Sequence, residues 1–181
     1  MVVFQDEVHF QVTTSVTRKW VPRGSRPKVC SAPCRKSVAY SGYVLPGTGE
    51  LIVDKPSWFN YETVIASLRN LISEIGPGEG QRIYLILDNA PWHKKAARLV
   101  QTEAREEYAD IRERMTLVFL PPYSPDLNPI EQVWRVTRRE VTHNVYFPDV
   151  ETLGEALDEY FAKLRKPNTK LSSLCAFKHK F

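Results

Sequence analysis

The chain has 181 residues, of which 43% are hydrophobic and 25% are charged, and its formal net charge is +4. This length and composition predict one globular domain, residues 1–181, with a sizeable core. The sequence contains no apolar run of roughly 18 residues and no secretory signal at its start, so we expect no membrane span and no export. Three cysteines are an odd number, and Cys30 and Cys34 lack the second Cys/His pair of a zinc site. We therefore expect a reduced, cytoplasmic protein.

Residues 1–12 alternate between apolar and polar side chains, which is typical of a β-strand with one apolar and one polar face. Asp6 is the one polar residue on the apolar face, and Glu7 points the other way. An isolated ionised carboxylate on such a face is costly unless it has a partner or a metal ion. Asp6 is therefore a candidate functional residue, the alternative being a strand that ends early.

The elements that follow predict a mixed α/β sheet with helices on both faces. A short strand or hairpin is expected at 19–24, and two strands joined by the turn "PGTG" at 37–54. Asn60 should cap a helix that ends near Gly76, and "RIYLILD" (82–88) reads as a central strand. Further elements are a charged helix over 94–113, a strand over 115–120, a helix over 129–141 and a helix over 150–166.

The positive charge is unevenly distributed. No acidic residue occurs between Val8 and Gly49, where seven basic residues alternate with Trp20, Tyr40 and Tyr43. A second basic group, residues 163–180, lies near the end of the chain. Either group alone could be a solvated face, but a long acid-free run with aromatic residues favours a polyanion, most simply nucleic acid, as partner. The seven basic residues of the first group are Arg18, Lys19, Arg23, Arg26, Lys28, Arg35 and Lys36.

Two further carboxylates stand out by their positions. Asp88 follows the central strand, at the end where α/β sheets place their sites, although an Asp-Asn pair also forms ordinary turns. Glu131 lies in the first turn of a helix, where it could form a capping box with Asn128 or pair with Arg135. Carboxylates that converge at neighbouring strand ends repel one another unless cations lie between them. Mg²⁺ suits such a site, and two ions can stabilise both oxygens of a phosphodiester displacement.

Three motifs in this order, "FQDEVHF", "LILDNAPWH" and "LPPYSPDLNPIEQVW", resemble the catalytic domain of DDE transposases. The closest likeness is to the mariner-like superfamily and its bacterial insertion-sequence relatives. The resemblance implies a ribonuclease H-like fold and a catalytic triad of Asp6, Asp88 and Glu131. In such enzymes the triad binds two divalent ions, Mg²⁺ or Mn²⁺. The ions support cleavage at the ends of the element and the transfer of the 3′-hydroxyl to target DNA.

The chain departs from the family pattern in two ways. The interval between Asp88 and Glu131 is long, with its extra length in the charged helix. The resemblance begins at residue 4, and no helix-turn-helix region precedes it, so we expect a cloned domain, one half of a split reading frame, or a remnant. A separate DNA-binding half and a homodimer on DNA are the expected partners. If the host is prokaryotic, we expect association with the nucleoid.

Two other functions stay open: a structure-specific nuclease of the same fold, and an inactive remnant that binds DNA or a full-length partner. Asn89 and His93 could position a reacting group or simply cap and pack, Trp92 and Trp134 are expected in the core, and Asp126 is expected to shape a turn. Binding to DNA should be mainly to phosphates, with strong salt dependence. The candidate nucleic-acid-binding residues are Arg18, Lys19, Arg23, Lys94, Lys95, Arg135, Arg138 and Arg139.

Overall fold

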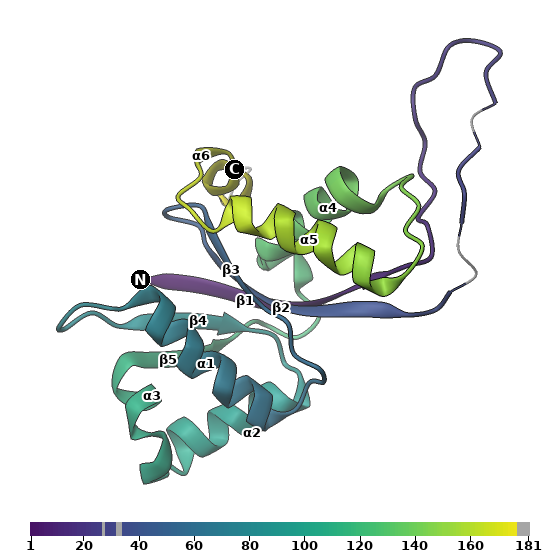
Figure 1. The fold of residues 1–181 in the computed structure, drawn as a ribbon. Helices are drawn as coiled ribbons and strands as arrows, with labels where there is room; N and C mark the ends of the chain where they lie inside the picture. The colour runs from purple at the N-terminus through teal and green to yellow at the C-terminus, as the bar shows by residue number, and fades with distance from the viewer. Residues whose placement is uncertain (27, 32–33, 177–181) are drawn as a thin grey trace.

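A five-stranded mixed sheet forms the centre of the computed structural model, which describes residues 1–26, 28–31 and 34–176 (Figure 1). The strand order is β3-β2-β1-β4-β5. Strands β1, β2 and β3 pair antiparallel, whereas β4 and β5 run parallel to β1. The strands are β1 (Val2–Gln11), β2 (Ser37–Leu45), β3 (Glu50–Asp54), β4 (Ile83–Leu87) and β5 (Met115–Phe119).

Helices cover both faces of the sheet, as predicted (Figure 1). One hydrophobic cluster joins β1, β4 and β5 to the helices α1 to α3, and a second joins β1, β2 and β3 to α4 to α6. Strand β1 is the middle strand of the sheet and, like β2, supplies residues to both clusters. The helices are α1 (Tyr61–Ile75), α2 (Pro91–Ala97), α3 (Ala109–Arg114), α4 (Ile130–Thr137), α5 (Val150–Leu164) and α6 (Thr169–Cys175).

Helix α1 begins and ends where the sequence predicts. The side chain of Asn60 accepts a hydrogen bond from the backbone N–H of Thr63, and the Thr63 hydroxyl accepts one from the backbone N–H of Asn60. Gly76 ends the helix with φ +56°, a left-handed conformation that glycine adopts without strain. None of the helices in the described part of the chain is long and apolar enough to cross a membrane.

Two predicted elements differ in the structure. No strand forms at 19–24 among the described residues; instead, residues 16–26, 28–31 and 34–36 belong to an arm that extends away from the body (Figure 1). The predicted helix over 94–113 is interrupted, because α2 continues into a π-helical turn, Arg98–Thr102, and Ala104 then takes a positive φ of 47°. A short 3₁₀ turn, Glu106–Tyr108, leads into α3, and this break returns the chain to the start of β5.

The predicted Asn128 cap is also wrong. Helix α4 begins at Ile130 without a side-chain cap, after a 3₁₀ turn, Pro125–Leu127, and ends in a π-helical turn, Arg138–Thr142. The Asn128 amide instead donates to the backbone oxygen of Gln5 in β1, at 2.9 Å. This contact fixes the start of α4 against the central strand, which matters for the position of Glu131.

Candidate active site

The two aspartates lie just beyond the point where the parallel pairing of β1 with β4 ends. The pairing of β1 with β4 ends at Phe4 and Ile86, and each aspartate follows two residues later, Asp6 in β1 and Asp88 after β4. The alternation of β1 places Asp6 on the face covered by α4, because Phe4 and Val8 belong to the same cluster as α4. The register of the sheet therefore sets the two carboxylates beside each other.

Glu131 reaches the same place from helix α4. Two side-chain hydrogen bonds hold α4 against β1, one on each side of Glu131 in the sequence. The first is the Asn128 bond to the backbone of Gln5, and the second runs from the Trp134 indole N–H to Oδ2 of Asp6, at 3.0 Å. The ion pair with Arg135 and the capping box that would have explained Glu131 structurally do not form within the described residues.

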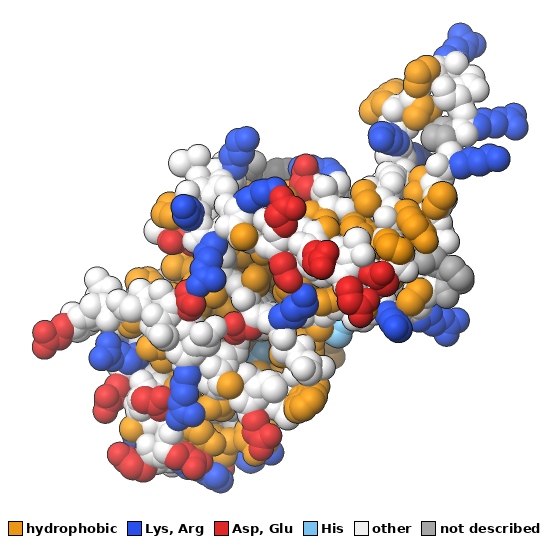
Figure 2. Space-filling model, viewed as in Figure 1, with side chains coloured by type: hydrophobic (Ala, Val, Ile, Leu, Met, Phe, Trp, Pro, Cys, Tyr) orange, Lys and Arg blue, Asp and Glu red, His pale blue; other side chains and the backbone are white. Residues whose placement is uncertain are grey.

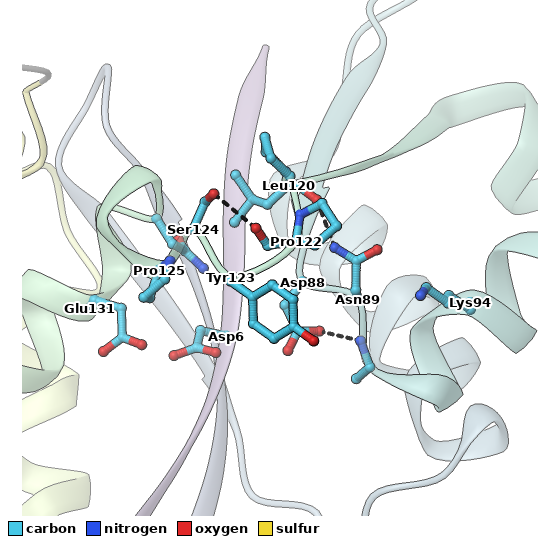
Figure 3. Close-up of a pocket in the computed structure, with 13 residues that line it drawn as sticks. Asp6, Asp88, Asn89, Lys94, Leu120, Pro122, Tyr123, Ser124, Pro125 and Glu131 are labelled. Carbon is cyan, nitrogen blue, oxygen red and sulfur yellow. Dashed lines mark hydrogen bonds between the residues drawn. The ribbon is translucent and has the colours of Figure 1, made fainter.

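The three carboxylates line one open pocket of about 560 Å³. Figure 3 shows Glu131, Asp6 and Asp88 in a row, with Lys94 beyond Asp88. The other wall is the proline-rich segment 120–125. Asn89 ties this wall to the end of β4, because its amide donates to the backbone oxygen of Leu120 at 2.7 Å.

Asp6 is the most strongly perturbed acid of the pocket. Its pKa is raised to about 7, mainly by burial and next by the negative charge of Glu131. The charge of Asp88 has a smaller effect in the same direction. The Trp134 hydrogen bond acts in the opposite direction but is outweighed. Without a cation, the ionised form of this carboxylate is therefore disfavoured near neutral pH.

Asp88 is held in a different way. Its Oδ1 accepts the backbone N–H of Ala90 at 2.9 Å and lies 2.6 Å from Nδ1 of His93. The hydrogen bond from His93 lowers the pKa of Asp88. Because both contacts are made to Oδ1, Oδ2 has no hydrogen-bond donor in the described chain. Asp88 is therefore ionised and orientated, with one oxygen left for a ligand.

The histidine that orientates Asp88 is buried between two carboxylates. His93 is 1% exposed, and its Nε2 lies 3.2 Å from Oε1 of Glu7. Burial alone would lower its pKa, but the hydrogen bonds with Asp88 and Glu7 outweigh burial and raise the pKa to about 9. Both ring nitrogens face acceptors, so both carry a proton and the ring is an imidazolium. His93 is a positioning residue that links the two faces of the sheet.

The remaining basic candidates are distributed over several surfaces. Lys94 lines the pocket, whereas Nζ of Lys95 lies 3.6 Å from the centre of the Tyr61 ring and Lys95 is not part of the pocket lining. Arg138 lies over the ring of Phe10 at 5.5 Å. Arg135 and Arg139 are exposed. Arg139 pairs with its neighbour Glu140. In the arm the three candidates, Arg18, Lys19 and Arg23, are all exposed.

Sequence reasoning missed three residues of this region. Glu7 was assigned to a polar face, yet its carboxylate is covered and accepts the Trp92 indole N–H at 2.9 Å. Trp134 is buried as predicted, but its bond to Asp6 was not foreseen. Tyr123 lies on the pocket rim, fully exposed and with φ +56°, a strained conformation for an aromatic residue. The three prolines around Tyr123 restrict the backbone, and they were the sequence feature that could have indicated its unusual conformation.

The donor set of the pocket suits divalent ions. Carboxylate oxygens are hard ligands of the kind that Mg²⁺ and Mn²⁺ prefer. Among the described residues, no three His, Cys, Asp or Glu side chains lie close enough to form a complete metal site by themselves. Mg²⁺ is usually held by one or two carboxylates together with water and substrate phosphate, so an open arrangement fits its chemistry.

The sheet order and the two helical layers define a ribonuclease H-like fold, and the pocket adds three acids, which come from β1, from the end of β4 and from α4. A family model described as "DDE superfamily endonuclease" matches residues 1–154. The chain therefore belongs to the DDE superfamily endonuclease family, and the predicted family and fold are confirmed.

Two curated relatives are bacterial. The "Uncharacterized protein y4pE/y4sA" of Sinorhizobium fredii (strain NBRC 101917 / NGR234) is 34% identical over 89 residues, which cover 48% of this chain and 58% of that protein. The "Insertion element IS630 uncharacterized 39 kDa protein" of Shigella sonnei is 23% identical over 145 residues, or 79% of this chain and 39% of the relative. The matches thus span less than two thirds of either relative.

Solved structures of the Mos1 transposase share the fold. The Mos1 strand transfer complex matches with a TM-score of 0.65 and 21% identity, covering 96% of this chain and 50% of that one. The Mos1 mariner paired-end complex with Mn matches with a TM-score of 0.64 and 20% identity, covering 96% of this chain and 51% of that one. The chain therefore corresponds to about half of a Mos1 chain.

Proposed function

We propose that this chain is the catalytic domain of a metal-dependent DNA transposase. It hydrolyses phosphodiester bonds at the ends of a mobile element and joins the 3′-hydroxyl to target DNA. One observation carries the proposal: carboxylates from β1, from the end of β4 and from α4 line a single open pocket, and neither Asp6 nor Glu131 forms an ion pair in the described chain. Family membership and the insertion-element relative support the same activity.

Two divalent ions, Mg²⁺ or Mn²⁺, are the cofactors that we propose. Asp6, Asp88 and Glu131 would hold them, and the Mos1 complexes that share the fold include structures with Mn and with Mg. When bound, the ions would activate a water molecule and neutralise charge at the attacking and leaving oxygens. The chain itself orientates the acids: His93 fixes Asp88, and Asn128 fixes the start of the helix that carries Glu131.

We propose that DNA enters the pocket along its basic edge. Lys94 lines the pocket next to Asp88, where it can meet a phosphate of the strand to be cut. Tyr123 offers an exposed ring on the opposite wall, on which a base can stack. Figure 2 shows basic side chains at the end of the arm, and Arg18, Lys19 and Arg23 would follow the DNA backbone outside the pocket.

A second copy of the chain and a separate DNA-binding half are the protein partners that we propose. The support is that the matched Mos1 structures are paired-end and strand-transfer complexes, of which this chain spans about half a subunit's length. An enzyme of this kind works on the chromosome, so we place it in the cytoplasm, associated with the nucleoid if the host is prokaryotic.

The test is Mn²⁺-dependent nicking of supercoiled plasmid, followed by joining of a labelled oligonucleotide with a free 3′-hydroxyl. Asp88→Ala and Glu131→Ala should each reduce nicking to background while circular dichroism shows a folded protein. Wild-type nicking by Asp88→Ala would contradict the proposed site.

Joined products separate the candidate functions. A transposase domain yields joined 3′-hydroxyl products, whereas a structure-specific nuclease yields cut products only. A remnant that only binds DNA yields neither and shows no saturable binding of Mn²⁺ by calorimetry. Each result therefore assigns the chain to one function.

A further inference from the structure

We propose that Trp134, seated over Gly42, is a positioning residue that fixes the Asp6 carboxylate for divalent-ion binding. The inference deepens the proposed function and rests on it. Trp134 donates its indole N–H to Oδ2 of Asp6 at 3.0 Å, across 128 positions of sequence. The bond joins α4, which carries Glu131, directly to the acid on β1.

The indole can reach Asp6 only because the neighbouring strand lacks a side chain. Gly42 on β2 lies directly opposite Asp6 in the antiparallel pair. A Cβ built at Gly42 would lie 2.3 Å from Cη2 and 2.6 Å from Cζ2 of Trp134. Such distances are impossible between carbon atoms without a shift of the ring. Glycine at this position therefore makes space for the indole beside Asp6.

Aromatic packing then fixes the direction of the indole. Trp134 is 1% exposed, and its ring meets Phe10 and Phe161 in edge contacts, with centroids at 6.4 Å and 6.1 Å. A ring that is enclosed in this way keeps one rotamer, so its N–H points steadily at Asp6. The bond holds one oxygen of Asp6 and thereby sets the rotation of the carboxylate.

This arrangement does more than fill the core. A phenylalanine or leucine at 134 would supply apolar packing, but it would leave a buried carboxylate without its indole donor. Groups that hydrogen-bond a metal-ligating side chain typically change metal affinity by about 10-fold to 100-fold when they are removed. Trp134 is such a group, because it donates a hydrogen bond to the proposed metal ligand Asp6.

The experiment measures Mn²⁺ binding to the whole chain by isothermal titration calorimetry, with a short DNA duplex present. Trp134→Phe removes the donor, and replacement of Trp134 by benzothienylalanine exchanges only the ring N–H for sulfur and keeps the shape. Both variants should bind Mn²⁺ about 10-fold or more weakly. The benzothienylalanine variant should keep the wild-type unfolding temperature to within about 3 °C, equivalent to roughly 1 kcal/mol.

Leu68→Val is the control, because Leu68 is fully buried in the hydrophobic cluster on the other face of the sheet, which contains neither Trp134 nor Asp6. It should lower the unfolding temperature and leave the Mn²⁺ affinity unchanged. If Trp134→Phe does not fold, the benzothienylalanine variant decides. Wild-type Mn²⁺ affinity in that variant overturns the inference alone, whereas no saturable Mn²⁺ binding by the unmodified chain overturns the proposed function as well.

Discussion

Strand β1 carries two neighbouring carboxylates that face opposite sides of the sheet and are treated differently by the fold. Each accepts an indole N–H: Asp6 from Trp134 at 3.0 Å and Glu7 from Trp92 at 2.9 Å. Beyond this shared contact the two sides diverge. Glu7 lies 3.2 Å from the buried imidazolium of His93, whereas Asp6 faces the like charges of Glu131 and Asp88.

The difference shows which charge the protein balances internally. A buried carboxylate is stable when a cation and hydrogen bonds meet it, and the Glu7 side has both. Asp6 has the hydrogen bond but forms no ion pair in the described part of the chain, and burial and then the charge of Glu131 raise its pKa to about 7. Such an imbalance costs stability in the free protein, and a bound divalent ion would remove it.

The largest effect is expected from Asp6→Asn. This substitution should reduce Mn²⁺-dependent nicking to background and yet stabilise the metal-free fold at pH 8. Since the folded-state pKa of Asp6 is raised from 3.8 to about 7, its stabilising proton is bound at low pH and lost as the pH rises through about 7. Asparagine cannot ionise, so above pH 7 the gain should be on the order of 2 kcal/mol. Thermal unfolding at pH 8 and pH 4 measures it.

Glu7→Gln is the matched variant on the other side of the sheet. It removes the negative charge that faces the His93 imidazolium, while the amide oxygen remains an acceptor, and it should destabilise the fold by about 1–3 kcal/mol. The two isosteric changes are thus expected to have opposite signs at pH 8. If both substitutions changed the stability at pH 8 in the same direction, the proposed difference between the two carboxylates would be wrong.

The second effect concerns His93, the cation of the balanced side. Its folded-state pKa is raised from 6.5 to about 9 by its hydrogen bonds with Asp88 and Glu7, which outweigh burial. The stabilisation is therefore complete below about pH 6.5 and is lost as the pH rises through 9. His93→Gln should flatten this part of the pH–stability curve and, by releasing Asp88, slow nicking about 10-fold or more. An unchanged curve between pH 6.5 and 9 would contradict the protonated state.

The sequence was sufficient for features that depend on local pattern. Alternation placed Asp6 on the core face of β1, the end of an apolar run marked Asp88, and Asn60 and Gly76 bounded α1. These features follow from the period of one element and its caps, which neighbouring residues determine. The fold class followed from the order of such elements, and family motifs joined Glu131 to the two aspartates.

The contacts that position the acids were beyond the sequence. Trp134 and Asp6 are 128 positions apart, and Asn128 and Gln5 are 123 apart, so packing of α4 on the sheet alone brings them together. The same packing overrode the expected Asn128 cap. Glu7 was misread because a polar residue type suggested solvent, although α2 supplies both a donor and a cation to cover it.

The smallest effect is expected for the two adjacent lysines of α2, of which one lines the pocket and the other packs outside it. Lys94 lines the pocket with Asp6 and Asp88, while Lys95 packs its ammonium group on Tyr61 at 3.6 Å. If the unbalanced side receives DNA phosphates, Lys94→Gln should reduce the slope of log affinity against log salt by about 0.9, the value for one phosphate contact. Lys95→Gln should leave that slope unchanged, as measured by fluorescence anisotropy with a labelled duplex. Equal loss in both variants would mean that DNA contacts the outer surface of α2 and does not enter the pocket.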